Sequence, residues 1–172
     1  SRSGDRAEEA RILPLLPGTA SYGWATTSEA IAYLRGLAIA HPDSPMLRAR
    51  LLAMLAMRHA ERGDRAEAIA YRDESRAAID DLGIPWLAAD VHRDHADVAL
   101  MIGDLQAAEA DAYRTYELMA SGAFREAWTS VALVVKVLHR RGRDTDARQW
   151  LSRFGDMAGA ADDVAQSRLA SW

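Results

Sequence analysis

The chain has 172 residues, a net charge of −4 and no cysteine, which excludes disulfides, thiolate nucleophiles and cysteine-ligated metal sites. Its acidic balance argues against a general nucleic-acid binder, and no apolar run approaches the roughly 20 residues of a membrane span. The first residues, Ser1 to Arg11, are mostly charged and polar, unlike a signal peptide. We therefore expect a cytoplasmic protein with no direct nucleic-acid or membrane partner.

Glycines divide the chain at regular intervals. Gly63, Gly103 and Gly142 lie 40 and 39 residues apart, and each ends an apolar run before a new run begins. A second set falls about midway between them, at Leu82-Gly83, Ser121-Gly122 and Ala158-Gly159. Glycine just past a helical run is a stop signal, because it enters the left-handed conformation without a Cβ penalty. The spacing predicts helices of about 19 residues that alternate with tight turns.

Helix starts carry signals of their own. Pro45 and Pro85 suit a first turn, and Thr26 and Glu29 have the spacing of a capping box. Strand signals are nearly absent. The pattern predicts an all-α fold with helices over 26–40, 44–62, 64–82, 85–102, 104–121, 123–141, 144–157 and 161–172, and a short helix over 5–13. Short connections make neighbours antiparallel, so the pairs are expected to stack into a right-handed α-solenoid.

The repeat frame gives one domain over 1–172. It contains a partial repeat over 20–43, repeats over 44–83, 84–122 and 123–160, and the start of a further repeat over 161–172. That last segment has Asp162 or Asp163 as its N-cap and carries Leu169 and Trp172 on one side. A solenoid normally ends in a helix with a polar outer face. We therefore expect the chain to be a fragment whose terminal helix makes a lattice or homodimer contact.

The turn sequences resemble a known repeat family. Gly63-Asp64-Arg65-Ala66-Glu67-Ala68-Ile69 is similar to the tetratricopeptide signature, and the frame recurs at Gly103 and Gly142. The small residue expected seven positions before each turn glycine is present at Ala56 and Ala96, whereas Val135 departs from it. The resemblance implies that Ala68, Ala108 and Ala147 are buried against the first helix of their own repeat.

The longer period resembles a narrower group. With Ser28-Glu29-Ala30-Ile31 early and Ala161-Asp162-Asp163-Val164 late, the chain is similar to the C-terminal repeats of actinobacterial multidomain signalling proteins. In these proteins an adenylate/guanylate cyclase or a helix-turn-helix regulator is linked to an AAA-type ATPase. The resemblance implies a noncatalytic bacterial regulatory module that contacts a protein segment or adjacent domains of the same polypeptide.

Catalytic and cofactor motifs are missing from the sequence. There is no Gly-x-Ser-x-Gly elbow and no phosphate-binding Gly-rich loop with lysine, so we expect neither an enzyme nor a cofactor. His92 and His95 are one helical turn apart, but a zinc site needs a third ligand, and the His-Glu-x-x-His pattern is not present. We expect both histidines to be packed or hydrogen-bonded between helices, with no metal. The basic cluster at Arg140-Arg141-Gly142-Arg143 is interpreted as a solvated helix end, with phosphate binding as the alternative.

The first helices of successive repeats should line a concave face. Counting back from each turn glycine places a polar set there: Arg50, Met57, Asp90, Arg93, Asp97, Thr129, Lys136 and His139. The main interpretation of this set is a solvated inner face of a noncatalytic scaffold or interaction module. The alternatives are a groove for a peptide or protein segment, in which Arg93, Lys136 and His139 would fix acidic groups, and an effector site for a small metabolite. Trp86 and Trp128 are expected to pack between stacked pairs.

Overall fold

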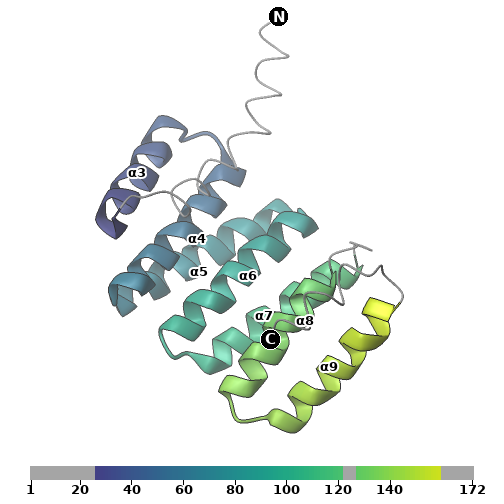
Figure 1. Cartoon of the computed structure of the whole chain (residues 1–172). Helices are drawn as coiled ribbons and strands as arrows, with labels where there is room; N and C mark the ends of the chain where they lie inside the picture. The colour runs from purple at the N-terminus through teal and green to yellow at the C-terminus, as the bar shows by residue number, and fades with distance from the viewer. Residues whose placement is uncertain (1–25, 122–126, 160–172) are drawn as a thin grey trace, which may run out of the picture.

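The computed structural model describes residues 26–121 and 127–159 (Figure 1). These ranges contain helices and turns and no strand. The helices are α3 (Thr27–Ala40), α4 (Pro45–Arg62), α5 (Arg65–Leu82), α6 (Pro85–Met101), α7 (Leu105–Ser121), α8 (Ala127–Arg140) and α9 (Asp144–Gly159). The prediction of an all-α fold is confirmed for the described ranges.

Glycine turns end the helices where the sequence predicts. Gly63, Gly83, Gly103 and Gly142 all adopt positive φ. At the Gly63 turn the Asp64 N–H donates to the His59 carbonyl at 2.9 Å. The Gly103 turn has the equivalent bond, from the Asp104 N–H to the Ala99 carbonyl at 2.8 Å. These bonds satisfy carbonyls that the helix end leaves open. Gly122 lies outside the described residues.

The residues predicted to begin helices are found at helix N-termini. Pro45 and Pro85 occupy the first turns of α4 and α6, where no backbone donor is needed. Before α3, the Thr26 hydroxyl accepts the Glu29 N–H at 3.3 Å, while the Thr26 N–H donates to the Glu29 carboxylate at 2.8 Å. The two bonds form the predicted capping box.

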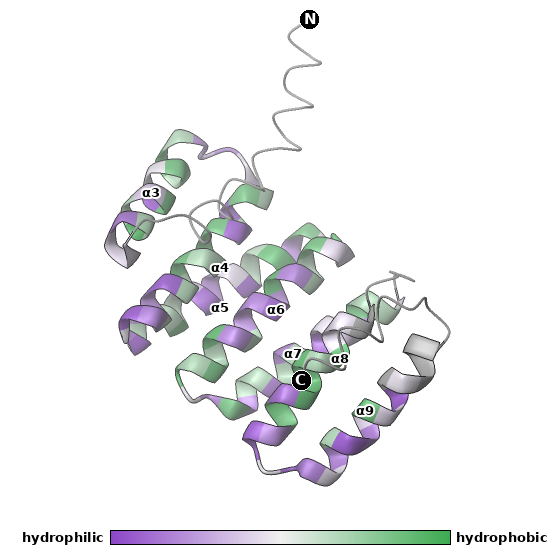
Figure 2. Cartoon of the chain, in the orientation of Figure 1, coloured by the Kyte–Doolittle hydropathy of each residue, from purple (hydrophilic) through white to green (hydrophobic). Residues whose placement is uncertain are grey.

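Helices follow one another across the molecule in chain order, from α3 at one end to α9 at the other (Figure 1). Each helix packs against the next, and α6 also packs against both α4 and α8. Apolar and hydrophilic residues are interleaved along every helix (Figure 2), as expected of amphipathic helices that bury one side. The helices α4, α6 and α8 therefore form a continuous row.

Alanine makes the close contacts within each pair. Ala68 and Ala108 are fully buried and Ala147 nearly so, as the turn motif predicts. Ala68 lies in a cluster with Ala56 and Val98, which places the small residues of α4 and α5 against α6. Small side chains on both helices allow the backbones to approach, and the predicted burial of these three alanines is confirmed.

Polar side chains connect each pair to the next. Arg65 donates to the Ile102 carbonyl, and Arg72 lies 3.4 Å from Asp104 at the following turn. Further along, Glu109 on α7 binds Arg141 and Arg143 at the turn before α9. The second helix of one pair thus reaches the turn of the following pair.

Some predictions fall outside the described residues. These are the short helix over 5–13 and the terminal helix over 161–172 with its lattice or dimer contact. The side chain of Trp128 is also outside them. Within the part that the structure describes, no helix combines the length and the hydropathy that crossing a membrane requires.

Candidate functional site

Charged side chains connect α4, α6 and α8 along the side that the sequence predicts to be functional. Arg50 Nη1 on α4 lies 3.8 Å from Asp90 Oδ2 on α6, and Arg93 Nη2 lies 3.0 Å from Asp90 Oδ1. On the other flank of α6, the Lys136 ammonium of α8 donates to Asp97 at 2.8 Å. The structure therefore brings these five predicted residues together. We call the surface that carries them the even-helix face.

The other three predicted residues contribute less to this face. Met57 is half-buried and packs on the alanine cluster of α4 and α5. Thr129 is half-buried at the start of α8. His139 is exposed, but its Nδ1 lies 2.8 Å from Asp144 Oδ1, so its ring is engaged with the turn before α9.

Asp94 belongs to the even-helix face and was missed by sequence reasoning. Its carboxylate lies 3.6 Å from Arg50 and 4.0 Å from Arg93, and its side chain is largely covered. Burial raises the pKa of Asp94 to about 6, against the opposing pull of both arginines. Asp94 follows Arg93 on α6, and its side chain lies between α6 and Arg50 of α4. The sequence does not show this contact, because it depends on how α4 packs against α6.

An apolar residue stands at each end of the α6 part of this face. Helical geometry places Trp86, Asp90, Arg93, Asp97 and Met101 within a narrow stripe, because each residue turns the helix by 100°. Trp86 is 48% exposed and Met101 46% exposed. Trp86 is thus about half exposed and is not enclosed between stacked pairs as the sequence predicts.

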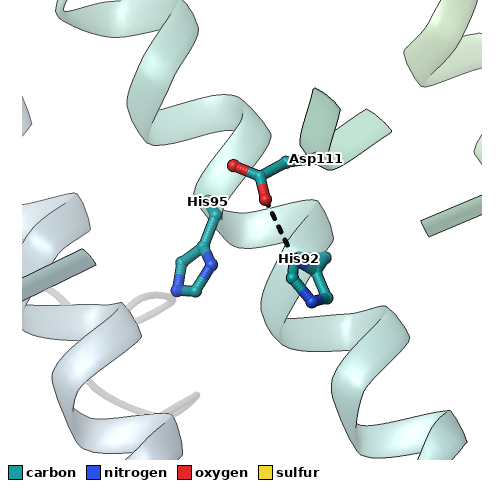
Figure 3. A group of neighbouring side chains, drawn as sticks. All are labelled: His92, His95 and Asp111. Carbon is teal, nitrogen blue, oxygen red and sulfur yellow. Dashed lines mark hydrogen bonds and ion pairs between the residues drawn. The ribbon is translucent and has the colours of Figure 1, made fainter. Parts of the chain in front are cut away.

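A second polar group lies inside the fold, on the opposite side of α6. His92 of α6 contacts Asp111, which α7 contributes, and His95 lies one helical turn along α6 from His92 (Figure 3). His92 Nδ1 is 2.9 Å from Asp111 Oδ1, and Arg76 of α5 donates to both Asp111 oxygens at 2.8 and 2.6 Å. Both histidines are buried, as predicted from their apolar-facing positions.

The ionisation of this group follows from its surroundings. Burial opposes the charge on Asp111, but the hydrogen bond from His92 and the charge of Arg76 hold its pKa below the ordinary value. Asp111 is therefore a carboxylate at neutral pH, and His92 donates to it through Nδ1. Burial lowers the pKa of His95 to about 3, so its ring is neutral.

His95 has no hydrogen-bond partner on either ring nitrogen among the described residues, and His92 Nε2 has none either. Buried polar atoms nearly always have partners, so each such atom needs an explanation. Asp111 was missed because it lies on a separate helix. A signal existed, since Asp111 falls among Ala108, Ala112 and Thr115 on the buried side of a predicted helix.

Two arginines of the basic cluster at the α8–α9 turn form ion pairs with acidic side chains of the same chain. Glu109 binds Arg141, and its other oxygen lies 2.5 Å from Arg143. Arg143 also pairs with Asp146 at 2.6 Å. These acidic partners compete with any phosphate, which disfavours the phosphate-binding alternative.

No protein-family model and no curated protein sequence matches this chain. The functional argument therefore depends on the geometry of the even-helix face and of the buried histidines.

Proposed function

We propose that this chain is a noncatalytic interaction module with a tetratricopeptide-like, right-handed solenoid arrangement. Its even-helix face is the inner surface, and it binds a peptide or protein segment within a larger regulatory protein or signalling assembly. The packing of α4, α6 and α8 in one row supports this arrangement, because first helices of such repeats line the inner surface.

The α6 stripe is the observation that carries the proposal. Exposed Trp86 and Met101 flank a run of charged residues, and aromatic residues and methionine are enriched where proteins bind partners. Met101 lies 15 positions after Trp86, so the two are about 22 Å apart along the helix at a rise of 1.5 Å per residue. An extended segment of about seven residues covers that length.

The charges on the face favour acidic groups in the segment. Side-chain exposure is 44% for Arg93 against 31% for its partner Asp90, and 55% for Lys136 against 38% for its partner Asp97. The cations thus retain more access to solvent than the carboxylates they pair with. A carboxylate of the segment can share them through charge-assisted hydrogen bonds.

A peptide fits this face better than a metabolite does. Small-molecule sites enclose most of the ligand within an apolar concavity. Here two ion pairs, Arg93–Asp90 and Lys136–Asp97, are about a third or more exposed, which suits a long segment that contacts many positions at once.

A peptide-library selection against the full chain tests the proposal. Selected sequences are expected to combine one large apolar residue with Asp or Glu. Replacing Trp86→Ala or Arg93→Glu should weaken the selected peptides about tenfold or more, because central aromatic and arginine contacts dominate interface energies.

Arg114→Glu is the matched control, since Arg114 is an exposed arginine of α7 that pairs with Glu117 at 3.5 Å away from this face. Binding should be unchanged in this variant. A selection that yields no binder, or binders that lose equal affinity in the Arg93 and Arg114 variants, contradicts the proposal.

A further inference from the structure

Three side chains of the kind that bind transition metals meet inside the fold between α6 and α7. We propose that His92, His95 and Asp111 form a binding site for a divalent transition-metal ion, and that the ion is Zn²⁺. Two imidazoles and a carboxylate are an established ligand type for zinc, which binds nitrogen and oxygen atoms from proteins.

The geometry needs only small side-chain adjustments. One ligand atom from each residue lies within 4.8 Å of the other two. Zinc with ligands at about 2.1 Å in a tetrahedral arrangement needs these atoms about 3.4 Å apart. Side chains on two adjacent helices reach that separation with shifts of about an ångström.

The unpartnered nitrogens are the second, independent observation. His95 is completely buried, and neither of its nitrogens has a partner among the described residues. A metal bond satisfies one nitrogen of a neutral imidazole, which is the form a metal requires. His95 is thus held in the protonation state in which it can bind an ion.

His92 provides the second imidazole through a change of tautomer. Its Nδ1 donates to Asp111, and a bound ion would take the place of the hydrogen that lies between the two groups. The hydrogen then resides on Nε2, which lies 3.8 Å from Asp80 Oδ1. A ligating histidine commonly donates its other N–H to a carboxylate, and a small movement of the exposed Asp80 side chain would bring its oxygen to hydrogen-bond distance.

The surrounding charges permit a cation. Arg76 holds both oxygens of Asp111, as outer hydrogen bonds commonly orient a ligating carboxylate. Arg72 adds a second positive charge, but it pairs with Asp73 at 3.2 Å and with Asp104 at 3.4 Å. These two carboxylates offset the charge of Arg72, and Asp80 lies 3.8 Å from His92 Nε2. A dication at the site therefore faces Asp111 as its charged ligand, with the charge of each arginine offset by a carboxylate partner.

Metal titration of the full chain, first dialysed against a chelator, tests the site. Zn²⁺ is expected to bind with one-to-one stoichiometry by calorimetry. At 100 times its dissociation constant it should raise the Tm by about 5 °C or more. Co²⁺ should give the visible absorption of a tetrahedral nitrogen–oxygen site.

His95→Leu separates metal binding from folding. It removes two unsatisfied nitrogens, so the metal-free variant should fold and melt at or above the wild-type Tm, while its affinity for Zn²⁺ falls about a hundredfold or more. His139→Gln, which removes an exposed histidine that also pairs with an aspartate, should bind Zn²⁺ as the wild type does.

Two results would overturn the site. One is the absence of Zn²⁺ binding and of a Co²⁺ absorption band in the wild type. In that case the unpartnered nitrogens of His92 and His95 would belong to a cluster with a purely structural role. The other is equal Zn²⁺ affinity in the wild type and in His95→Leu. Peptide binding on the even-helix face is unaffected by either result.

Discussion

At the scale of single residues, His95 and its neighbour Asp94 respond to acid in opposite directions. Burial lowers the pKa of His95 to about 3, whereas burial raises that of Asp94 to about 6. His95 is faced by His92 and Asp111, and by Arg76 and Arg72 of α5. Asp94 is faced by Arg50 of α4 and by its own helix neighbours Asp90, Arg93 and Asp97.

The sign of each contribution follows from which state binds the proton first. Below about pH 6.5 the unfolded chain protonates His95 while the folded chain does not, so stability is lost as pH falls from 6.5 toward 3. Between about pH 6 and 4 the folded chain protonates Asp94 first, so the cost of its buried charge is relieved. Each effect is at most about 1.4 kcal/mol per pH unit, and in the wild type the two largely cancel between pH 6 and 4.

Separating the two groups makes the effect measurable. Urea unfolding of the metal-free protein in the presence of a chelator should show that Asp94→Asn loses stability more steeply than the wild type from pH 6 to 4. His95→Leu should instead gain stability relative to the wild type over that interval, because only the Asp94 effect remains. If the free energy of unfolding depended on pH in the same way for all three proteins, burial would not shift the pKa values of His95 and Asp94 as described.

At the scale of helices, the alanine contacts determine how closely each pair packs. Ala68 is fully buried between α4, α5 and α6, whereas Ala70 is exposed on the same helix. Replacing Ala68→Leu should overpack the contact and reduce the free energy of unfolding by about 1–3 kcal/mol. Ala70→Leu is the control and should change it by less than about 0.5 kcal/mol. Chemical denaturation measures both, and an Ala68→Leu protein as stable as the wild type would contradict the packing frame.

The helix boundaries could be predicted from sequence because their signals are local. Gly63 and Gly103 stop helices through their own φ, and Pro45 and Pro85 start them through theirs. In each case a backbone property of one residue decides the boundary, so no tertiary information is needed. Predicted and observed boundaries of α4 and α6 consequently agree within a residue.

The sites could be predicted only in part, because they depend on helix rotation. The repeat frame placed Arg50, Asp97 and Lys136 on one face, since positions in successive first helices are related by the repeat period. Asp111 lies 16 residues after His95 on another helix, and only the packing of α7 on α6 brings its carboxylate to the histidines. The exposure of Trp86 likewise depends on which side of α6 its neighbours leave uncovered.

At the scale of the whole molecule, the two polar groups lie on opposite sides of α6. Its outward stripe carries Asp90, Arg93 and Asp97, and its inward side carries His92 and His95. The same helix packs against α4, α5, α7 and α8. Its position is thus fixed from several directions, which holds the exposed stripe in a defined orientation for a partner.

Amide hydrogen exchange of the full chain, with and without a selected peptide, tests the central claim most directly. If the even-helix face binds the segment, protection should increase in α4, α6 and α8, most strongly between Trp86 and Met101. Exchange in α9, and on the side of α7 that carries Arg114, should be unchanged. Protection confined to α7 and α9, with none in the α6 stripe, would contradict the account.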